Sequence, residues 1–263
     1  MNKQQCFILV FLVFLILIIN YNTIDSTLIR IFDEEIKIVD KGVVERIIDG
    51  DTIVINDSSI RLLGINCPEK NTFYYSEAKE FLEEWIFEKE VELGYDKNKY
   101  DRYQRILAYV FINGKNINLE IVENGYANFY FPNGKTKLYW DFVNAWKNCI
   151  KENKNLCEKS ENICADCIIL KEFDYWKDSV SFYNKCDFDC DLSNWEIKDE
   201  GRKTFVFENF VLKKKKSVKI NVEKGEDNEN VLFWTGEDYV WTKTGDALFL
   251  RDGEGRLVLW KNY

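Results

Sequence analysis

The chain has 263 residues, of which 46% are hydrophobic and 31% charged, so it can bury more than one core and is not a disordered polymer. Its net charge of -9 excludes a globally positive surface for nucleic acid or acidic membranes, so any phosphate binding must be local or carried by a metal ion. The absence of histidine excludes Ser-His-Asp and Cys-His nucleophile pairs and histidine zinc sites. A hydrolase built on this sequence would have to use carboxylates, arginines or a hard cation.

The N-terminus begins with an apolar segment. Residues 6–19 form an unbroken run of fourteen apolar residues between Lys3 and Asn20. This length is typical of a signal-peptide core and is shorter than the ~20 residues of a spanning helix. No small-residue cleavage site is evident, so an uncleaved membrane anchor is a close alternative, and a buried helix of a soluble domain is the third. We expect residues 1–25 to be a signal peptide or membrane anchor that places the rest of the chain outside the cytoplasm.

After a polar stalk, residues 41–150 show the pattern of a first domain that mixes strands and helices. The predicted strands are rich in Ile, Val, Leu or Tyr and are bounded by turn residues. They are Gly42–Ile48, Thr52–Asn56, Ile60–Ile65, Val91–Tyr95 and Ile106–Ile112.

Three helices are predicted in the same region. The first begins at the N-cap candidate Ser76, and the second lies between the N-cap candidate Asn118 and Gly125. The apolar positions of the first and third helices repeat at helical spacing and indicate core contacts. These positions are Ala78, Phe81, Leu82, Trp85 and Ile86 in the first helix, and Tyr139, Phe142, Val143, Trp146 and Ile150 in the third.

Residues 151–178 are rich in Lys, Glu, Asn and Cys and are predicted to be a cross-linked connector without a large core of its own. An even number of cysteines after an apolar leader favours three disulfides in an oxidising compartment, with a four-thiolate zinc site as the alternative. Their pairing is not determined by the sequence, although Cys186 and Cys190 are close enough to bridge each other or to tie the next domain to the connector. The six cysteines are Cys149, Cys157, Cys164, Cys167, Cys186 and Cys190.

Residues 179–263 contain only short strand patterns separated by turns, which predicts an all-β sandwich. The run Lys213–Lys216 is more typical of a solvated loop or a protected strand edge than of a phosphate-binding patch. The predicted strands are Ser179–Tyr183, Trp195–Asp199, Thr204–Phe207, Val218–Val222, Val231–Trp234, Ala247–Arg251 and Leu257–Trp260.

Three short segments of the first domain carry an unusual set of charges. They are Asp49-Gly50-Asp51-Thr52, the stretch from Arg61 to Glu69, and Asp101-Arg102-Tyr103-Gln104-Arg105. In this order on a five-stranded pattern, they resemble the staphylococcal-nuclease-like (thermonuclease) family over about residues 41–150. The resemblance implies an OB-fold β-barrel with helices and a nuclease that hydrolyses phosphodiester bonds.

The resemblance also implies roles for individual residues. Arg61 and Arg105 would bind the phosphate through bidentate hydrogen bonds, and Glu69 would be the general base on the attacking water, with a metal-bound hydroxide as the alternative base. Arg102 and Tyr103 correspond to substrate-binding or site-lining positions, although Tyr103 could instead be a half-buried packing aromatic.

One calcium ion is implied by the same resemblance. Its ligands would be Asp51, Asn66 and the backbone carbonyl of Cys67. The family's second aspartate ligand corresponds to Asn66, so the site loses one formal negative charge and calcium should bind more weakly. Asp49 is the candidate to compensate without binding the ion directly. The Cys67 thiol is not expected to be a nucleophile, because no base pairs with it.

The segment Cys186–Ile197 resembles the lamin-tail domain, whose strands carry a similar Asp-Leu-Ser-Gly-Trp signature, here Asp191-Leu192-Ser193-Asn194-Trp195. The resemblance covers roughly residues 178–263 and implies an immunoglobulin-like sandwich that serves as a binding or anchoring module. Its Trp and Phe positions are also explained as core.

The sequence therefore predicts an extracytoplasmic, calcium-assisted endonuclease that cuts single-stranded or frayed DNA and RNA without a small-molecule cofactor. Contact with a membrane through residues 6–19 would follow if the leader is retained. Two other classes stay open: a non-catalytic protein that binds nucleic acid or the envelope, and an envelope structural protein in which the barrel is a spacer.

Overall fold

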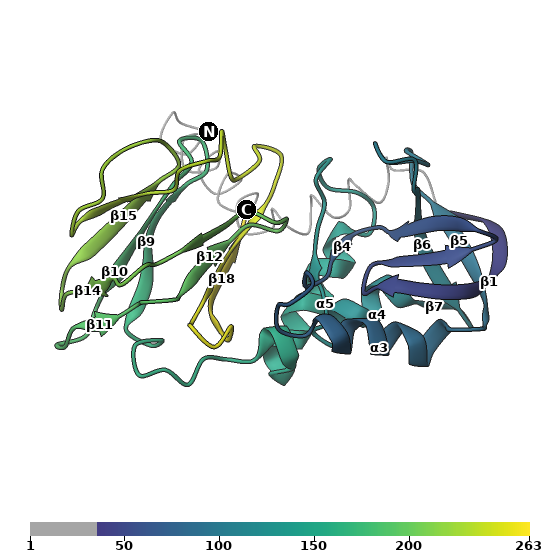
Figure 1. Cartoon of the computed structure of the whole chain (residues 1–263), viewed down its shortest axis with the longest axis horizontal. Coiled ribbons are helices and arrows are strands. Elements are labelled where there is room, and N and C mark those ends of the chain that lie inside the picture. Colours follow the sequence, from purple (N-terminus) through teal and green to yellow (C-terminus); the bar gives the residue numbers. More distant parts are fainter. Residues whose placement is uncertain (1–35) are drawn as a thin grey trace, which may run out of the picture.

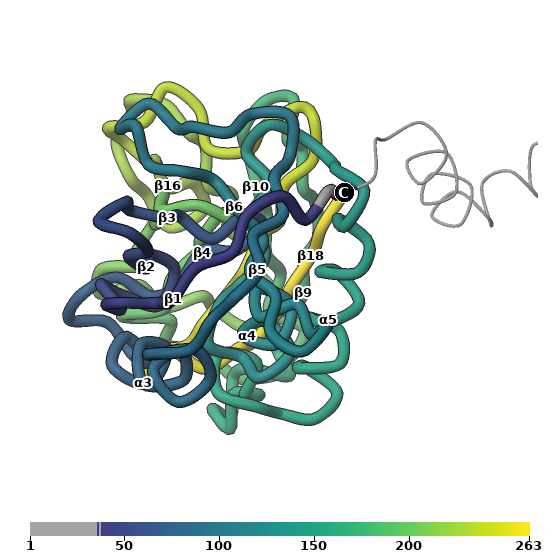
Figure 2. The backbone as a smooth tube through the Cα atoms, turned by 90° about the vertical axis from the view of Figure 1, so that its right-hand side faces the viewer, coloured from purple at the N-terminus to yellow at the C-terminus, as the bar shows by residue number. Residues whose placement is uncertain are grey.

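The computed structural model describes residues 36–263, which form two domains lying side by side (Figure 1). The first is a barrel with helices and the second contains strands only. Figure 2 shows β1 and β5 on the barrel face turned away from the second domain. The predicted leader at 1–25 and the stalk before residue 36 lie outside the described residues. Within residues 36–263, no helix combines the length and the apolar character that crossing a bilayer requires.

The barrel domain is built on one long bent strand. β1 pairs with β2 on one side and with β5 on the other, and two irregularities in its β1–β2 register let it bend between them. The parallel pairing of β3 with β6 closes the sheet. The OB-type barrel is therefore confirmed. Its strands are β1 (Lys37–Asp49), β2 (Thr52–Ile55), β3 (Ser58–Leu62), β5 (Glu90–Tyr95), β6 (Ile106–Ile112) and β7 (Lys115–Asn116).

One predicted strand is interrupted. The prediction of a single strand over Ile60–Ile65 is wrong, because β3 ends at Leu62 and a turn follows. Gly64 adopts a φ of +76°, and a Cβ there would lie 2.9 Å from the Phe142 ring, so both the conformation and the space require glycine. The chain then starts β4 (Ile65–Asn66), which pairs with β8 (Asn128–Phe129).

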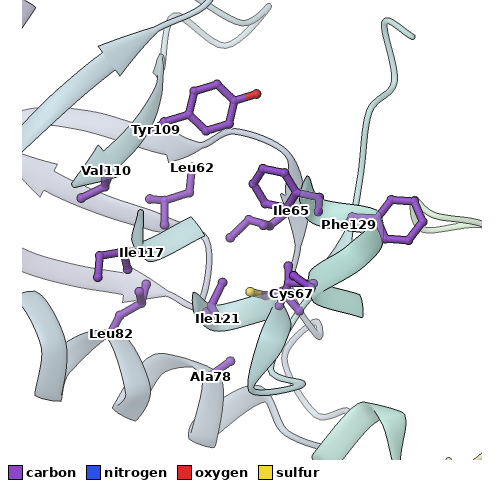
Figure 3. Packing of buried hydrophobic residues seen from close by; sticks show 14 of the residues in the cluster. Leu62, Ile65, Cys67, Ala78, Leu82, Tyr109, Val110, Ile117, Ile121 and Phe129 are labelled. Carbon is purple, nitrogen blue, oxygen red and sulfur yellow. The ribbon is translucent and has the colours of Figure 1, made fainter. Parts of the chain in front are cut away.

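Three helices cover the barrel, namely α3 (Tyr75–Ile86), α4 (Ile117–Glu123) and α5 (Tyr139–Glu152). Their predicted apolar faces are confirmed as core: Ala78 and Leu82 of α3 point toward Ile117, Ile121 and the barrel (Figure 3).

Both predicted N-caps are wrong. Helix α3 starts one residue before Ser76, after Tyr74 in a left-handed conformation. Asn116 caps α4 by accepting from the Leu119 amide. Asn118 is fully buried instead, and its side chain bonds the Val110 amide and the Leu63 carbonyl, at 2.9 and 2.8 Å, so that it fastens α4 to the barrel.

The six later cysteines form three disulfides, which confirms the preferred prediction and overturns the zinc alternative. Cys186 and Cys190 do not bridge each other, because each is bonded to a cysteine of the segment predicted as the connector. The pairs are Cys149–Cys157, Cys164–Cys190 and Cys167–Cys186.

The second domain is a sandwich of two four-stranded sheets, which confirms the predicted all-β fold. Trp195 and Phe207 lie in its core, as expected. The stretch 151–178 contributes β9 to the outer sheet, next to β10. The outer sheet has the order β16 (Val231–Phe233), β15 (Ser217–Asn221), β10 (Ser179–Asn184), β9 (Ile168–Asp174). The inner sheet has the order β13 (Thr204–Val206), β12 (Glu196–Lys198), β17 (Ala247–Arg251), β18 (Leu257–Asn262). A separate pair joins β11 (Cys190–Asp191) to β14 (Val211–Leu212).

The inner sheet of the sandwich packs directly on the barrel domain. Phe249 of β17 belongs to the first domain's core and meets the Trp146 ring edge-on, with ring centroids 5.4 Å apart. Trp260 of β18 meets Phe129 in the same manner at 6.1 Å. The two domains therefore share apolar core in addition to polar contacts.

Three buried carboxyl groups lie where the β12–β13 hairpin meets the barrel: Asp199, Glu200 and Asp246. Burial and the neighbouring charge of Asp246 raise the pKa of Asp199 to about 7, against the opposing effect of Lys198 and Lys203. Burial and the Asp246 charge also raise the pKa of Glu200 well above its ordinary value. The folded interface therefore holds protons that the unfolded chain would release at neutral pH.

Replacing Phe249 by alanine tests the shared core. Phe249→Ala opens a cavity between the domains, so we expect the free energy of unfolding to fall by about 3–5 kcal/mol in denaturant titrations. Phe188→Ala is the matched control in the same domain, because Phe188 is exposed; its expected effect is within about 0.5 kcal/mol. Equal losses in the two variants would contradict the shared core.

The pKa of Asp199 predicts how stability depends on pH. The pKa of Asp199 in the folded protein lies above the unfolded value of about 3.9. The contribution of Asp199 to the free energy of unfolding is therefore fully present below pH ~4 and is lost as pH rises through about 7. Asp199→Asn keeps the oxygen that accepts from the Lys203 amide. We therefore expect the variant to be more stable than the parent at pH 8, by up to about 4 kcal/mol, and to match it near pH 4.

Thermal unfolding between pH 4 and 8 measures this difference. Asp166→Asn is the control, because that carboxylate is exposed beside Lys159. If thermal stability depends on pH in the same way in Asp199→Asn and in the parent, the Asp199 carboxyl is not the cause of that dependence.

Candidate active site

The turn between β1 and β2 places the first acidic group. The Asp51 amide donates to Asp49 Oδ1 at 3.1 Å, which fixes the Asp-Gly-Asp turn. A Cβ on Gly50 would lie 2.8 Å from both Ala78 and the Cys67 sulfur, so glycine is required for this close approach. The buried Asp51 carboxylate accepts from Thr52 Oγ1 at 3.0 Å and from the Cys67 amide at 3.3 Å. Asp51 thus joins the turn to the segment after β4.

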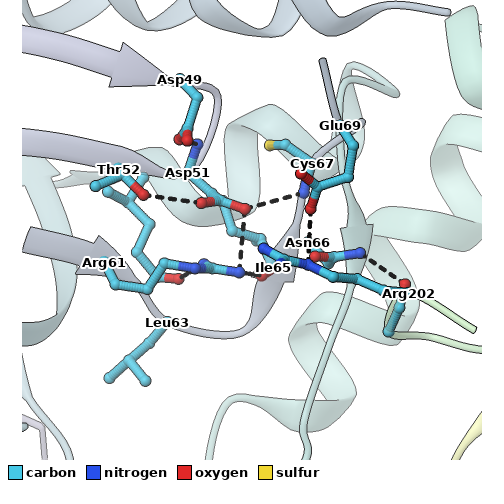
Figure 4. A network of polar contacts seen from close by, with 12 residues as sticks. Asp49, Asp51, Thr52, Arg61, Leu63, Ile65, Asn66, Cys67, Glu69 and Arg202 are labelled. Carbon is cyan, nitrogen blue, oxygen red and sulfur yellow. Dashed lines mark hydrogen bonds and ion pairs between the residues drawn. The ribbon is translucent and has the colours of Figure 1, made fainter. Parts of the chain in front are cut away.

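Arg61 lies on β3 directly opposite Thr52 of β2, so its guanidinium reaches Asp51 (Figure 4). Its Nη2 is 3.0 Å from Asp51 Oδ2 and donates to the Ile65 carbonyl at 2.8 Å, and Nη1 donates to the Leu62 carbonyl. A buried guanidinium with this many acceptors is held in one orientation.

The turn at Gly64 brings Asn66 and Cys67 beside Asp51. The Asn66 amide nitrogen donates to the Gly201 carbonyl of the second domain at 2.9 Å, which leaves its oxygen on the side of Asp51 (Figure 4). The Cys67 thiol is buried, and burial followed by the Asp51 charge raises its pKa well above the ordinary value. A thiol in this environment stays protonated and is a poor nucleophile.

Glu69 lies at the rim of the site, where it meets the second domain. Arg202 Nε is 2.7 Å from Glu69 Oε1, and the two side chains are 67% and 55% exposed. Arg202 is not among the site residues that the sequence predicted. No local signal could identify it, because its partner is far away in the chain and belongs to another domain.

Arg105 is brought toward Arg61 by the parallel pairing of β3 and β6. Arg61 lies opposite Leu107, and Arg105 precedes Leu107 by two residues, so the arginines come from adjacent segments of the sheet. Arg105 Nε is 2.7 Å from Asp101 Oδ2. Burial would raise the pKa of Asp101, but the hydrogen bonds from Arg105 and the Tyr103 amide outweigh burial and lower it.

Tyr103 is not a packing aromatic. Its side chain is 65% exposed at the tip of the loop, and the Arg102 guanidinium lies 4.7 Å from its ring centroid. Arg105 lies on the same ring at 5.6 Å. The loop therefore presents two guanidinium groups and one aromatic face to solvent beside the barrel.

The oxygen ligands predicted for calcium come from two of these segments. Asp51, the Asn66 amide oxygen and the Cys67 carbonyl are hard donors of the type that Ca²⁺ prefers. The pKa of Asp49 is raised by partial burial and then by the charge of Asp51, so negative charge is concentrated at this turn. Over residues 36–263, no three Asp, Glu, His or Cys side chains gather closely enough to form a metal cluster on their own. A bound cation would therefore also need amide, carbonyl or water oxygens, which the proposed donor set supplies.

Both domains match models of known protein families. The model of the staphylococcal nuclease homologue family matches residues 59–159, and that of the lamin tail domain matches residues 165–263. The chain is 34% identical over 128 residues to a thermonuclease of Staphylococcus intermedius, a match that covers 44% of this chain and 75% of that protein. It is 38% identical over 104 residues to a thermonuclease of Staphylococcus hyicus, covering 35% of this chain and 62% of the relative.

A longer relative shows the same domain in a larger context. Endonuclease YhcR of Bacillus subtilis is 29% identical over 143 residues, which cover 46% of this chain and 12% of YhcR. These matches agree with the barrel fold of the first domain. The chain belongs to the staphylococcal nuclease homologue family of nucleases, with a lamin tail domain packed against its nuclease domain.

Proposed function

We propose that this protein is an extracytoplasmic endonuclease that hydrolyses phosphodiester bonds of single-stranded or frayed DNA and RNA. The observation that carries the proposal is the convergence of Asp51, Arg61 and Glu69 from separate segments, with Arg105 immediately before the neighbouring strand β6. The three disulfides support an oxidising compartment outside the cytoplasm.

Each residue then has a chemical role. Arg61 and Arg105 donate to the non-bridging oxygens of the scissile phosphate, where their hydrogen bonds strengthen as negative charge develops. Glu69 accepts the proton of the attacking water. Arg102 and Tyr103 contact the substrate next to the cut, because they are exposed on the loop that carries Arg105.

Calcium belongs to the same proposal. Asp51, Asn66 and the Cys67 carbonyl would hold the ion, and its positive charge would stabilise the charge that develops on the phosphate. With an amide in place of one carboxylate, the ion should bind weakly. Arg61 also pairs with Asp51 at 3.0 Å and compensates part of the charge of that carboxylate.

Removal of Arg105 tests the phosphate contact. Arg105→Ala should reduce kcat/KM on single-stranded DNA and RNA by about 100-fold or more, because it loses a donor to the transition state. Cleavage is measured for the full chain with calcium and with chelator. Arg256→Ala is the matched control, because Glu158, Glu161 and Glu254 surround that arginine within 4 Å and leave it unsuited to a phosphate. Absence of cleavage by the parent over a wide calcium range would overturn the enzyme and favour the binding protein.

Glu69→Gln tests the general base. It keeps the shape and an oxygen that can accept from Arg202, so KM should change little while kcat falls about 100- to 10,000-fold. Glu77→Gln, on the exposed side of α3, should leave both constants unchanged. A Glu69→Gln enzyme with parental kcat would assign the proton transfer to another group.

A further inference from the structure

The second domain contributes a charged residue to the rim of the candidate active site. Strands β12 and β13 form a hairpin whose loop spans residues 199–203, and this loop faces β4 and β8 of the nuclease domain. Its end is closed by the Asp199 amide, which donates to the Lys203 carbonyl at 3.2 Å, and by the Lys203 amide, which donates to Asp199 Oδ1 at 3.0 Å. The loop is therefore a defined turn.

The nuclease domain holds this loop through its main chain. Asn66 donates to the Gly201 carbonyl at 2.9 Å, and Asn128 donates to the Glu200 carbonyl at 2.8 Å. The Phe131 amide donates to Glu200 Oε2 at 3.3 Å. All three contacts are buried and lie immediately before residue 202. The backbone at Arg202 is therefore fixed relative to β4, on which Asn66 lies.

These contacts also explain the amide at position 66. The Asn66 amide can donate to the Gly201 carbonyl, whereas an ionised aspartate there would place two acceptors against each other. The residue that weakens the calcium site is the one that docks the hairpin. Asn66 thus binds the loop of the second domain and, as an amide, brings no formal negative charge to the calcium site.

The Arg202 side chain is exposed although its backbone is fixed. It is 67% exposed, against 29% for Arg105 and 10% for Arg61. Its contact with Glu69 is an exposed ion pair, and such a pair contributes at most about 1 kcal/mol to stability. A phosphate offers two non-bridging oxygens as acceptors and can therefore replace the carboxylate. Arg202 is thus the most accessible of these three guanidinium groups.

Arg202 and Arg61 both act electrostatically on the Tyr130 hydroxyl. Burial and then Asp199 raise the pKa of Tyr130, and the positive charges of Arg61 and Arg202 both oppose this rise. The Tyr130 hydroxyl therefore senses both guanidinium groups. In a chain with a net charge of -9, a further cation at this position supplies local attraction for a polyanion.

We propose that Arg202 of the lamin tail domain is a substrate-binding residue of the nuclease site, which contacts a phosphate of the single strand beside Glu69. This inference rests on the proposed nuclease function. In the free protein Arg202 pairs with Glu69. A substrate phosphate takes over the guanidinium, so that binding of the strand releases the Glu69 carboxylate for its role as base.

The test compares Arg202→Ala, Arg202→Lys and the control Arg256→Ala in the full chain. Cleavage of a single-stranded oligonucleotide gives kcat and KM, and fluorescence anisotropy in chelator gives binding at several salt concentrations without turnover. For Arg202→Ala we expect KM to rise at least about 10-fold. The logarithm of the association constant should depend less steeply on the logarithm of salt concentration, with a slope smaller in magnitude by about 0.7, the value for one lost phosphate contact on a single strand. Arg202→Lys should keep the slope but not the full kcat/KM, because lysine lacks the planar fork.

The outcomes separate this inference from the proposed function. If the parent does not cut but Arg202→Ala lowers its salt slope, the nuclease proposal fails and the Arg202 contact stands. If the parent cuts and Arg202→Ala has parental KM and slope, the contact is refuted. Faster cleavage by Arg202→Ala with unchanged binding would also refute it and would make Arg202 an inhibitor of Glu69.

Discussion

The buried ion pair of Asp51 and Arg61 is the interaction around which the candidate active site is organised. Removing two charges from water costs several kcal/mol for each ion unless every oxygen and N–H finds a partner. Here Asp51 accepts from Thr52 and from the Cys67 amide, and Arg61 donates to the carbonyls of Leu62 and Ile65. Those partners come from β2, β3, β4 and the residue after β4, so the requirement to satisfy one pair of charges helps to determine how these segments meet.

The sequence predicted the features that depend on local pattern. The apolar faces of α3 and α5 follow from spacing, since each side chain's direction is set by the period of its element. The bounds of β6 follow from its apolar residues and the turn residues beside them. The helix starts were wrong because capping depends on which side chain is already engaged: Asn118 satisfies the barrel's backbone, which leaves Asn116 to cap α4.

For the candidate site, the sequence supplied the charged residues of the barrel but not their neighbours from the second domain. Arg202 and Asn128 make contacts that depend on how two domains dock, and docking is decided by core residues such as Phe249 rather than by any motif. The disulfide pairing also depends on tertiary structure, because Cys164 and Cys167 directly precede β9 and lie beside their partners where β9 pairs with β10. Roles for Arg61, Glu69 and Arg105 are chemical proposals that both the sequence and the geometry support.

The short passage between the domains has a mechanical consequence. The Cys149–Cys157 disulfide closes the end of α5, and the chain then pairs with β18, where Leu257 bonds both the Glu158 carbonyl and the Ser160 amide. Cys164 and Cys167 follow within a few residues and are covalently tied to the sandwich. The passage therefore has no length in which to act as a hinge, unlike an ordinary interdomain linker. The outer sheet, on the side away from the barrel in Figure 1, is therefore held at a set distance and angle from the candidate active site.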